Sequence, residues 1–170
     1  MRAIAAALII FITFILQSTV FQYIEFFGIR PNAALIITVA FAMLRTDIEG
    51  AIVGFFSGLL QDLVYGRVIG LNALLFMCIG AVCGKPFKDF YRENYFLPIF
   101  LVAGATIFYE FSVFTATFLF RGRLDMVYYL QRIIIPSVAY NAFLAFPLYR
   151  VIYSVNKSLE DRERAGRRFY

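Results

Sequence analysis

The sequence predicts an all-α protein that crosses a membrane as a bundle of about six helices. Of its 170 residues, 62% are hydrophobic and 16% are charged. Soluble globular domains are roughly 45–50% apolar and about 25% charged, so a soluble body of this size could not cover its core with polar side chains. Because a spanning helix needs roughly 20 apolar residues, the chain has room for about six spans and for no large separate domain.

The expected helices form one transmembrane domain over residues 1–153. They cover residues 3–22, 32–45, 50–65, 69–84, 95–120 and 129–153. The first stretch follows a single basic residue, Arg2, and no small-residue cleavage site comes after it, which favours a membrane span over a signal peptide. The second stretch begins after Gly28 and Pro31, which are typical of a turn, and it ends at Arg45.

A turn at residues 66–70 separates the third stretch from the fourth. The second, third and fourth stretches are short for a full crossing, so the sequence leaves open whether they span the bilayer or enter it as broken helices. The basic loop 85–94 precedes the long fifth stretch, and residues 121–125 precede the sixth. Residues 154–170 form a basic tail directly after a span, which favours contact with anionic lipid over contact with nucleic acid.

The distribution of lysine and arginine predicts the orientation of the bundle. With both termini in the cytoplasm, eleven of the 16 basic residues fall on the cytoplasmic side and five on the other. Cytoplasmic loops of membrane proteins carry an excess of basic residues. We therefore expect an even number of spans with both termini in the cytoplasm.

The sequence lacks the usual signs of an enzyme or a metal site. Histidine, the commonest general base and metal ligand, is absent, and there is no glycine-rich phosphate loop, zinc pattern or nucleophile elbow. The two cysteines, Cys78 and Cys83, are five residues apart in an apolar stretch, where a helix points them to different faces. We therefore expect no catalytic activity, no cofactor, no metal and no disulfide.

Three glycines in the third stretch recur at intervals of four residues, at Gly50, Gly54 and Gly58. This spacing places them on one face of a helix and opens a groove where a second helix can approach closely. Two interpretations remain open at this point. The face either packs against another helix of the same bundle or receives the membrane helix of a partner protein.

Polar residues within the apolar stretches are candidate functional residues, because they are costly at membrane depth. Glu110 lies about fourteen residues, or ~21 Å, into the fifth stretch, so it is either protonated or faces the bundle interior. Asp62 and Arg132 fall near the same side of the membrane and are expected either to pair with each other or to extend to the headgroups. Asn141, between two prolines of the last stretch, is expected to bond to a carbonyl freed by a proline bend.

Several short motifs resemble one bacterial family. The stretch from Gly54 to Leu74, with its Gln61-Asp62 and Gly70-Leu71-Asn72 segments, resembles the pattern around the third and fourth helices of the MreD rod shape-determining membrane proteins. Residues 16–21 resemble the first helix of that family, and residues 136–142 resemble the last. One departure is Asn32, because the family pattern has an acid after the proline, which puts any role of that carboxylate in doubt here.

The resemblance implies a non-catalytic scaffold or regulator in the inner membrane, within the complex that elongates the lateral peptidoglycan wall. Its partners would be the membrane helix of MreC and, through MreC, the MreB filament, the RodA glycosyltransferase and its transpeptidase. The resemblance also implies a six-helix fold similar to the substrate-binding subunits of energy-coupling-factor transporters. That similarity supplies the alternative function, a small-molecule-binding subunit with a pocket near Asp62, Asn72, Glu110 and Arg132.

Overall fold

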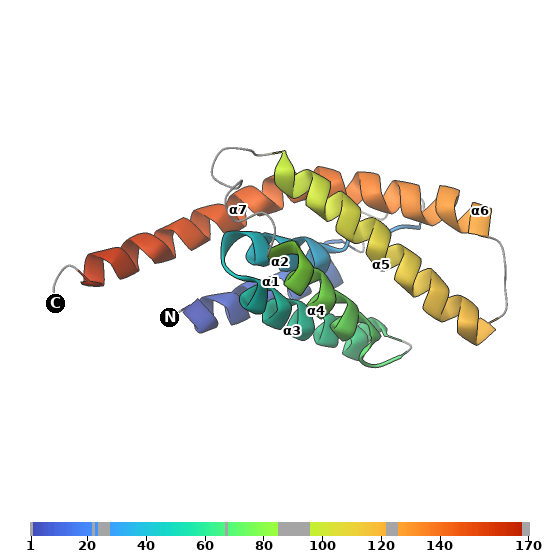
Figure 1. Cartoon of the computed structure of the whole chain (residues 1–170), viewed down its shortest axis with the longest axis horizontal. Helices are drawn as coiled ribbons and strands as arrows, with labels where there is room; N and C mark the ends of the chain where they lie inside the picture. Colours follow the sequence, from blue (N-terminus) through green and yellow to red (C-terminus); the bar gives the residue numbers. More distant parts are fainter. Residues whose placement is uncertain are drawn as a thin grey trace.

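The protein is helical, and the prediction of an all-α fold is confirmed (Figure 1). The structure is a computed structural model, and it describes residues 2–21, 23, 28–66, 68–84, 96–121 and 126–167. The helices of these residues are α1 (Arg2–Thr19), α2 (Ala33–Leu44), α3 (Asp47–Tyr65), α4 (Leu71–Gly84), α5 (Leu97–Arg121), α6 (Met126–Tyr129), the π-helical turn η1 (Leu130–Ile134) and α7 (Ile135–Arg167).

Three helices in the described part of the chain are long and apolar enough to cross a membrane. They are α3, the segment Leu97–Ala116 of α5, and the continuous segment Val127–Ser158 that joins α6, η1 and α7. The sequence left open whether the second, third and fourth stretches cross the membrane. Of these, α3 has the length of a span, whereas α2 and α4 contain only 12 and 14 residues. At 1.5 Å per residue α2 is about 18 Å long, which is too short to cross a hydrocarbon core of about 30 Å by itself.

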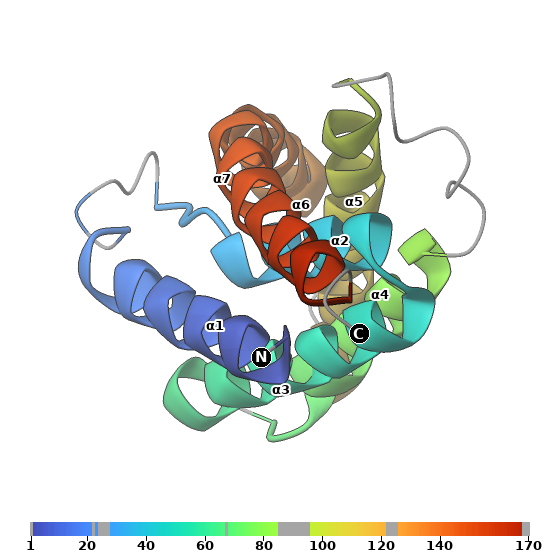
Figure 2. The ribbon, with the colours of Figure 1, turned by 90° about the vertical axis from the view of Figure 1, so that its left-hand side faces the viewer.

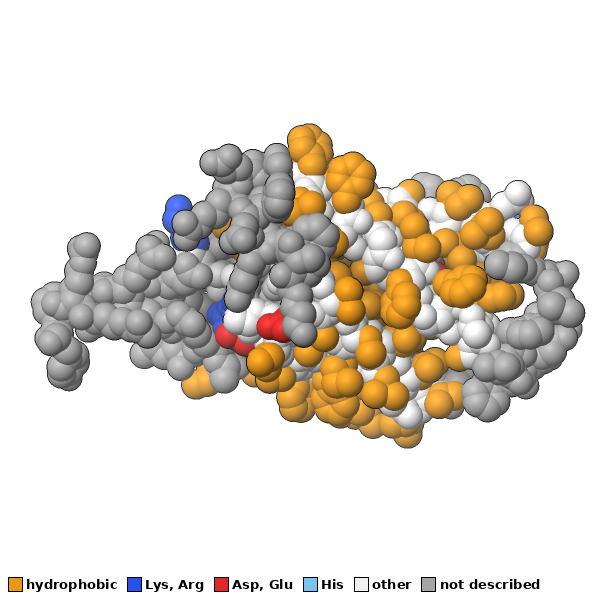
Figure 3. Space-filling model, in the orientation of Figure 1, with side chains coloured by type: hydrophobic (Ala, Val, Ile, Leu, Met, Phe, Trp, Pro, Cys, Tyr) orange, Lys and Arg blue, Asp and Glu red, His pale blue; other side chains and the backbone are white. Residues whose placement is uncertain are grey.

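Helix α2 occupies the centre of the bundle (Figure 2). Its residues from Ala33 to Met43 are all buried, and the helix packs against α1, α3, α4, α5 and α7. A helix that is apolar on every side requires such an enclosure. The outer surface of the molecule is also rich in hydrophobic side chains (Figure 3), which suits a surface that faces lipid.

The glycine face of α3 packs against helices of the same chain. A Cβ atom added at Gly50 would lie 2.5 Å from Cβ of Ala42 in α2, and one added at Gly58 would lie 2.5 Å from the carbonyl oxygen of Asn72 in α4. At Gly54 the added atom would collide with the backbone of Phe76 in α4. The interpretation of this face as a partner groove is therefore replaced by internal packing, because α4 and α2 already fill the space that the glycines open.

The π-helical turn η1 precedes α7 and ends two residues before Pro136. Pro136 has no N–H to donate, and its ring disfavours a regular α-helical turn at the preceding residues. In η1 the N–H of Ile135 donates to the carbonyl of Leu130, five residues back. After this turn α7 continues through Pro147 to Arg167, so residues 154–167 extend the helix beyond the boundary expected at residue 153.

Candidate functional site

Asp62, near the end of α3, lies at the buried N-terminus of α4. Its carboxylate is 1% exposed and accepts hydrogen bonds from the backbone N–H groups of Gly70 (2.9 Å), Asn72 (3.2 Å) and Ala73 (3.1 Å). The first N–H groups of a helix have no partner within that helix, and the helix dipole favours a negative charge beside them. Asp62 therefore acts as a cap that joins the end of α3 to the start of α4.

The local sequence explains this cap. The N–H of Gly66 donates to the carbonyl of Asp62 at 2.9 Å, which closes the last turn of α3. Gly70 has φ +99°, a left-handed conformation that side chains other than glycine rarely adopt. This conformation turns the chain back, so the first N–H groups of α4 come within reach of the carboxylate.

The expected pairing of Asp62 with Arg132 is not present. The carboxylate oxygens of Asp62 accept bonds from backbone N–H groups, whereas the exposed Arg132 guanidinium lies 5.8 Å from the centre of the Tyr128 ring. The backbone donors replace a basic partner because three N–H groups at a helix start can stabilise the carboxylate without a counter-ion. Arg132 thus fits the alternative of a side chain that extends away from the bundle.

Asn72 links the α3–α4 turn to α5. Its side-chain oxygen accepts a hydrogen bond from the Tyr109 hydroxyl at 2.8 Å. The Tyr109 ring packs on Phe76 of α4, with 5.2 Å between the ring centres. The polar contact and the ring contact together hold the middle of α5 against α4.

Asn141 of α7 lies at a second buried helix start, that of α2. Its side-chain oxygen accepts from the N–H of Asn32 at 2.9 Å, and its amide nitrogen donates to the Thr106 hydroxyl of α5 at 3.2 Å. Gln17 of α1 accepts from the N–H of Ala34 at 3.2 Å. The prediction that Asn141 bonds to a carbonyl freed by a proline was wrong, because the N–H groups at the start of α2 lie closer and need an acceptor.

Asn32 itself caps α2, at the position where the family resemblance led us to expect an acid. Its side-chain oxygen accepts from the N–H of Leu35 at 3.2 Å. An amide oxygen serves as an N-cap about as well as a carboxylate oxygen does. The departure at Asn32 therefore leaves the cap in place and removes only a charge.

Glu110 faces the last helix. The Tyr129 hydroxyl donates to its carboxyl group at 3.3 Å, and the Tyr129 ring packs on Phe114 at 4.8 Å between ring centres. Among the described residues, no hydrogen bond or ion pair joins Glu110 or Arg132 to Asp62 or Asn72. The four polar residues expected in one pocket are thus not joined into one hydrogen-bonded cluster.

Sequence reasoning missed several residues of these polar contacts. Gln17 opens a short polar run at the end of α1, and Thr106 is a single polar residue in an apolar stretch, so attention to uncharged polar positions, and not only to ionisable ones, would have found them. Arg45 at the end of α2 bonds to Asn156 of α7 at 2.8 Å and to Glu49 at 3.0 Å. No local signal separates Tyr109 from the many other aromatic residues of the chain.

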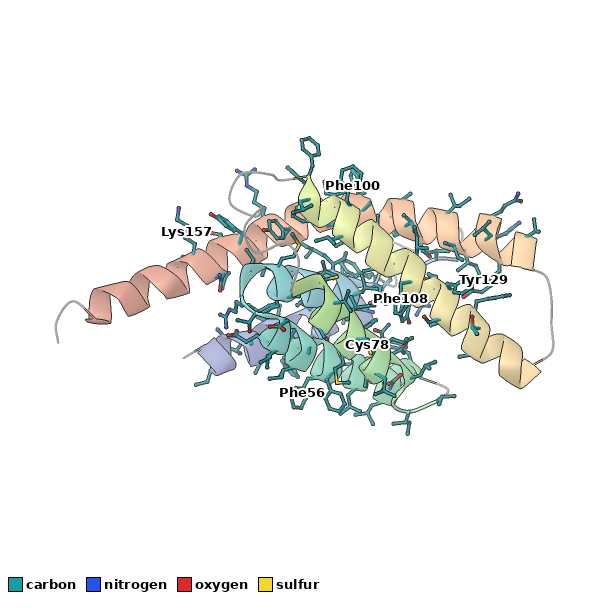
Figure 4. The ribbon with its side chains drawn as sticks, in the orientation of Figure 1. Phe56, Cys78, Phe100, Phe108, Tyr129 and Lys157 are labelled. Atoms are coloured by element: carbon teal, nitrogen blue, oxygen red, sulfur yellow. The ribbon has the colours of Figure 1, made fainter. Side chains whose placement is uncertain are left out.

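An open apolar groove lies between α4 and α5. Its volume is about 320 Å³. On the α4 side it is lined by Cys78, Ile79, Val82 and Cys83, and on the α5 side by Phe100, Leu101, Gly104, Ala105 and Phe108. A Cβ atom added at Gly104 would meet no other atom within 4 Å. Since residues four apart share a helix face, Gly104 forms a notch between the exposed rings of Phe100 and Phe108, both on α5 in Figure 4.

Comparison with known proteins identifies the family. No curated protein and no solved structure matches the chain. The similarity to substrate-binding subunits of energy-coupling-factor transporters therefore stays a prediction. The family model described as "rod shape-determining protein MreD" matches residues 1–158, which is most of the chain. The chain therefore belongs to the MreD family of rod shape-determining membrane proteins.

Proposed function

We propose that this protein is a non-catalytic membrane scaffold of the cell-elongation complex, and that it binds the membrane helix of MreC in the α4–α5 groove. Membership of the MreD family places the protein in rod shape determination. The groove is the observation that carries the proposal, because it is a large apolar recess in the outer surface of a membrane bundle. The glycine face of α3 does not compete for this role, since α2 and α4 cover it.

The lining of the groove favours a helix as its occupant. Helices associate in membranes through close packing, with small residues at the contact, and Gly104 and Ala105 supply such residues beside two phenylalanine rings. A pocket for a specific small molecule normally adds several convergent polar groups. Among the described residues that line the groove, only the two cysteines carry a polar side-chain atom, so the groove suits the side chains of an apolar helix better than a polar ligand.

Hydrogen bonds fix the positions of the helices that form the groove. Tyr109 and Asn72 join α5 to α4 near one part of it, and Glu110 and Tyr129 join α5 to the last helix. A partner helix bound there would take a fixed position and angle. We propose that this positioning acts through MreC on the MreB filament, RodA and its transpeptidase, and that no reaction occurs in the bundle itself.

We also propose an inner-membrane location with both termini in the cytoplasm. The start of α1 and the end of α7 lie toward the same side of the molecule in Figures 1 and 2. The excess of lysine and arginine predicted for that side supports a cytoplasmic assignment. We propose that in this orientation the basic tail, residues 154–170, contacts anionic headgroups.

The test is purification of the tagged protein from its native membrane in mild detergent, with mass spectrometry of the proteins that remain bound. We expect MreC with the wild-type protein and a loss of about tenfold or more with Gly104→Leu, because that side chain fills the notch. Ile107→Phe is the matched control, since Ile107 is exposed on α5 and does not line the groove.

Two outcomes would contradict the proposal. Equal recovery of MreC with Gly104→Leu would exclude the groove as its binding site. Recovery of nucleotide-binding ATPases with a coupling membrane subunit would instead identify a transporter subunit, the alternative that the family resemblance raised.

A further inference from the structure

A small cavity lies where α1, α2 and α3 meet, apart from the residues that line the α4–α5 groove. It holds about 10 Å³, which is room for one water-sized sphere. Its lining includes Thr13 and Gln17 of α1 and Ser57 and Gln61 of α3, together with apolar side chains. A dry cavity is normally apolar throughout, so these polar groups distinguish this one.

Gln61 provides the second observation. Its side-chain oxygen Oε1 is buried and accepts no hydrogen bond from any described group. A buried acceptor without a donor is costly, because in the unfolded chain water bonds to it. The oxygen belongs to a residue whose side chain lines the cavity, so a guest in the cavity can reach it.

Two of the polar groups that line the cavity already have hydrogen-bond partners. The Ser57 hydroxyl donates to the carbonyl of Val53, and Gln17 Oε1 accepts from the N–H of Ala34. The missing partner must therefore donate a hydrogen bond and fit a volume of about 10 Å³. An acyl chain has no donor, and a lipid headgroup is too large.

We propose that one water molecule occupies this cavity and donates a hydrogen bond to Gln61 Oε1. Thr13 is buried and lines the same cavity, and its hydroxyl is the second partner of this water. The water links α1 to the turn of α3 that carries Asp62. Helix α1, whose outer face is exposed and apolar, is therefore attached to the bundle through a hydrated polar contact.

The direct test is an experimental structure of the full chain in lipid nanodiscs at a resolution that shows ordered water. We expect density for one water at about 2.7–3.2 Å from Gln61 Oε1. An empty cavity, or a Gln61 side chain that bonds to a protein group instead, would overturn the proposal.

The sign of a stability change gives an independent test. If a water satisfies Gln61, Gln61→Met removes a made hydrogen bond and lowers the melting temperature by roughly 2–4 °C. If the cavity is dry, the same substitution removes an unsatisfied acceptor and raises the melting temperature. Gln131→Met, at an exposed position of η1, is the matched control and is expected to cause no shift.

A third variant tests whether the water is shared. Thr13→Val is expected to lower the melting temperature, and the double variant with Gln61→Met is expected to fall no further than the larger single effect. Additive falls would show that no single water joins the two residues. If a variant fails to insert into the membrane, the presence or absence of density for the water in the wild-type structure decides whether the proposal holds.

Discussion

The two helix contacts of α4 differ in how glycine is used. Against α3 the glycines Gly50, Gly54 and Gly58 bring backbones together, and an added Cβ atom would collide with α4 or α2. Against α5, Gly104 faces open space within an apolar groove of about 320 Å³. One contact is closed and the other is open, although both are made by small residues in apolar helices.

This difference shows that a small residue in a membrane helix has two opposite uses. It lets two helices of one bundle pack closely, or it leaves a recess for a helix that comes from elsewhere. Only the closed contact carries the regular spacing that a sequence pattern reveals. The open contact rests on one glycine between two phenylalanines, which is inconspicuous in a chain that is 19% aromatic.

The largest expected effect comes from a large side chain placed between α3 and α4, in the closed contact. Gly54→Leu forces a side chain into the backbone of α4, and we expect it to destabilise the protein by about 3 kcal/mol or more. Gly104→Leu is the matched control and is expected to cost less than about 0.5 kcal/mol, because open space surrounds that position. Thermal unfolding in detergent measures both. Equal losses would remove the distinction between the contacts.

The cap of α4 is expected to have the next largest effect. Asp62→Ala leaves three N–H groups at the start of α4 without their acceptor, and we expect a loss of about 2–3 kcal/mol in the free energy of unfolding. Asp62→Asn keeps one acceptor oxygen and is expected to lose less. In a double-mutant cycle with Arg132→Gln the effects should add, since the two side chains do not meet. A coupling energy between them would contradict the backbone cap.

A smaller effect is expected from loss of the hydrogen bond between Tyr109 and Asn72, which joins α5 to α4 beside the groove. Tyr109→Phe removes the hydrogen bond to Asn72 and keeps the ring on Phe76, so we expect a loss of about 0.5–1.5 kcal/mol. Tyr128→Phe is the control, because Tyr128 is exposed and its hydroxyl neither donates nor accepts a hydrogen bond with a described group. Unfolding in detergent gives both values. A neutral Tyr109→Phe would show that the ring contact alone holds α5 on α4.

The smallest change distinguishes the two contacts by its sign. Gly104→Ala is expected to stabilise the protein by about 0.5–1 kcal/mol, because alanine favours a helix and meets no neighbour there. Gly54→Ala is expected to destabilise it, since even one methyl group meets the backbone of Phe76. Melting temperatures of the two variants, compared under the same detergent conditions, check the signs. A stabilised Gly54→Ala would mean that α4 can shift away.

Much of the helical framework could be predicted from the sequence. Each of the first five expected stretches overlaps one helix of the structure, the last overlaps the end of α6, η1 and part of α7, and the turn at residues 66–70 lies between α3 and α4. Two details could not be predicted, the turn η1 before Pro136 and the extension of α7 to Arg167. The extension is rich in charged residues, so its hydropathy resembles that of a tail even though the backbone stays helical.

The candidate residues were found more readily than their partners. Asp62 and Asn141 stand out because each is polar in an apolar stretch, and both are buried. Their partners could not be foreseen, because Asn141 bonds to Asn32, 109 positions away along the chain. A hydrogen bond over that separation depends on how the helices are arranged, and no local pattern carries this information.

The amino-acid sequence by itself determined the class of protein, the positions of the helices, the close glycine spacing on α3 and the family resemblance. These features follow from hydropathy, turn residues and short motifs, which are local properties of the chain. The tertiary structure decided that the glycine face is filled from within, that Asp62 caps a helix in place of pairing with Arg132, and that α4 and α5 leave a groove. Each of these depends on which helix lies opposite, and burial and collision are properties of the assembled helices.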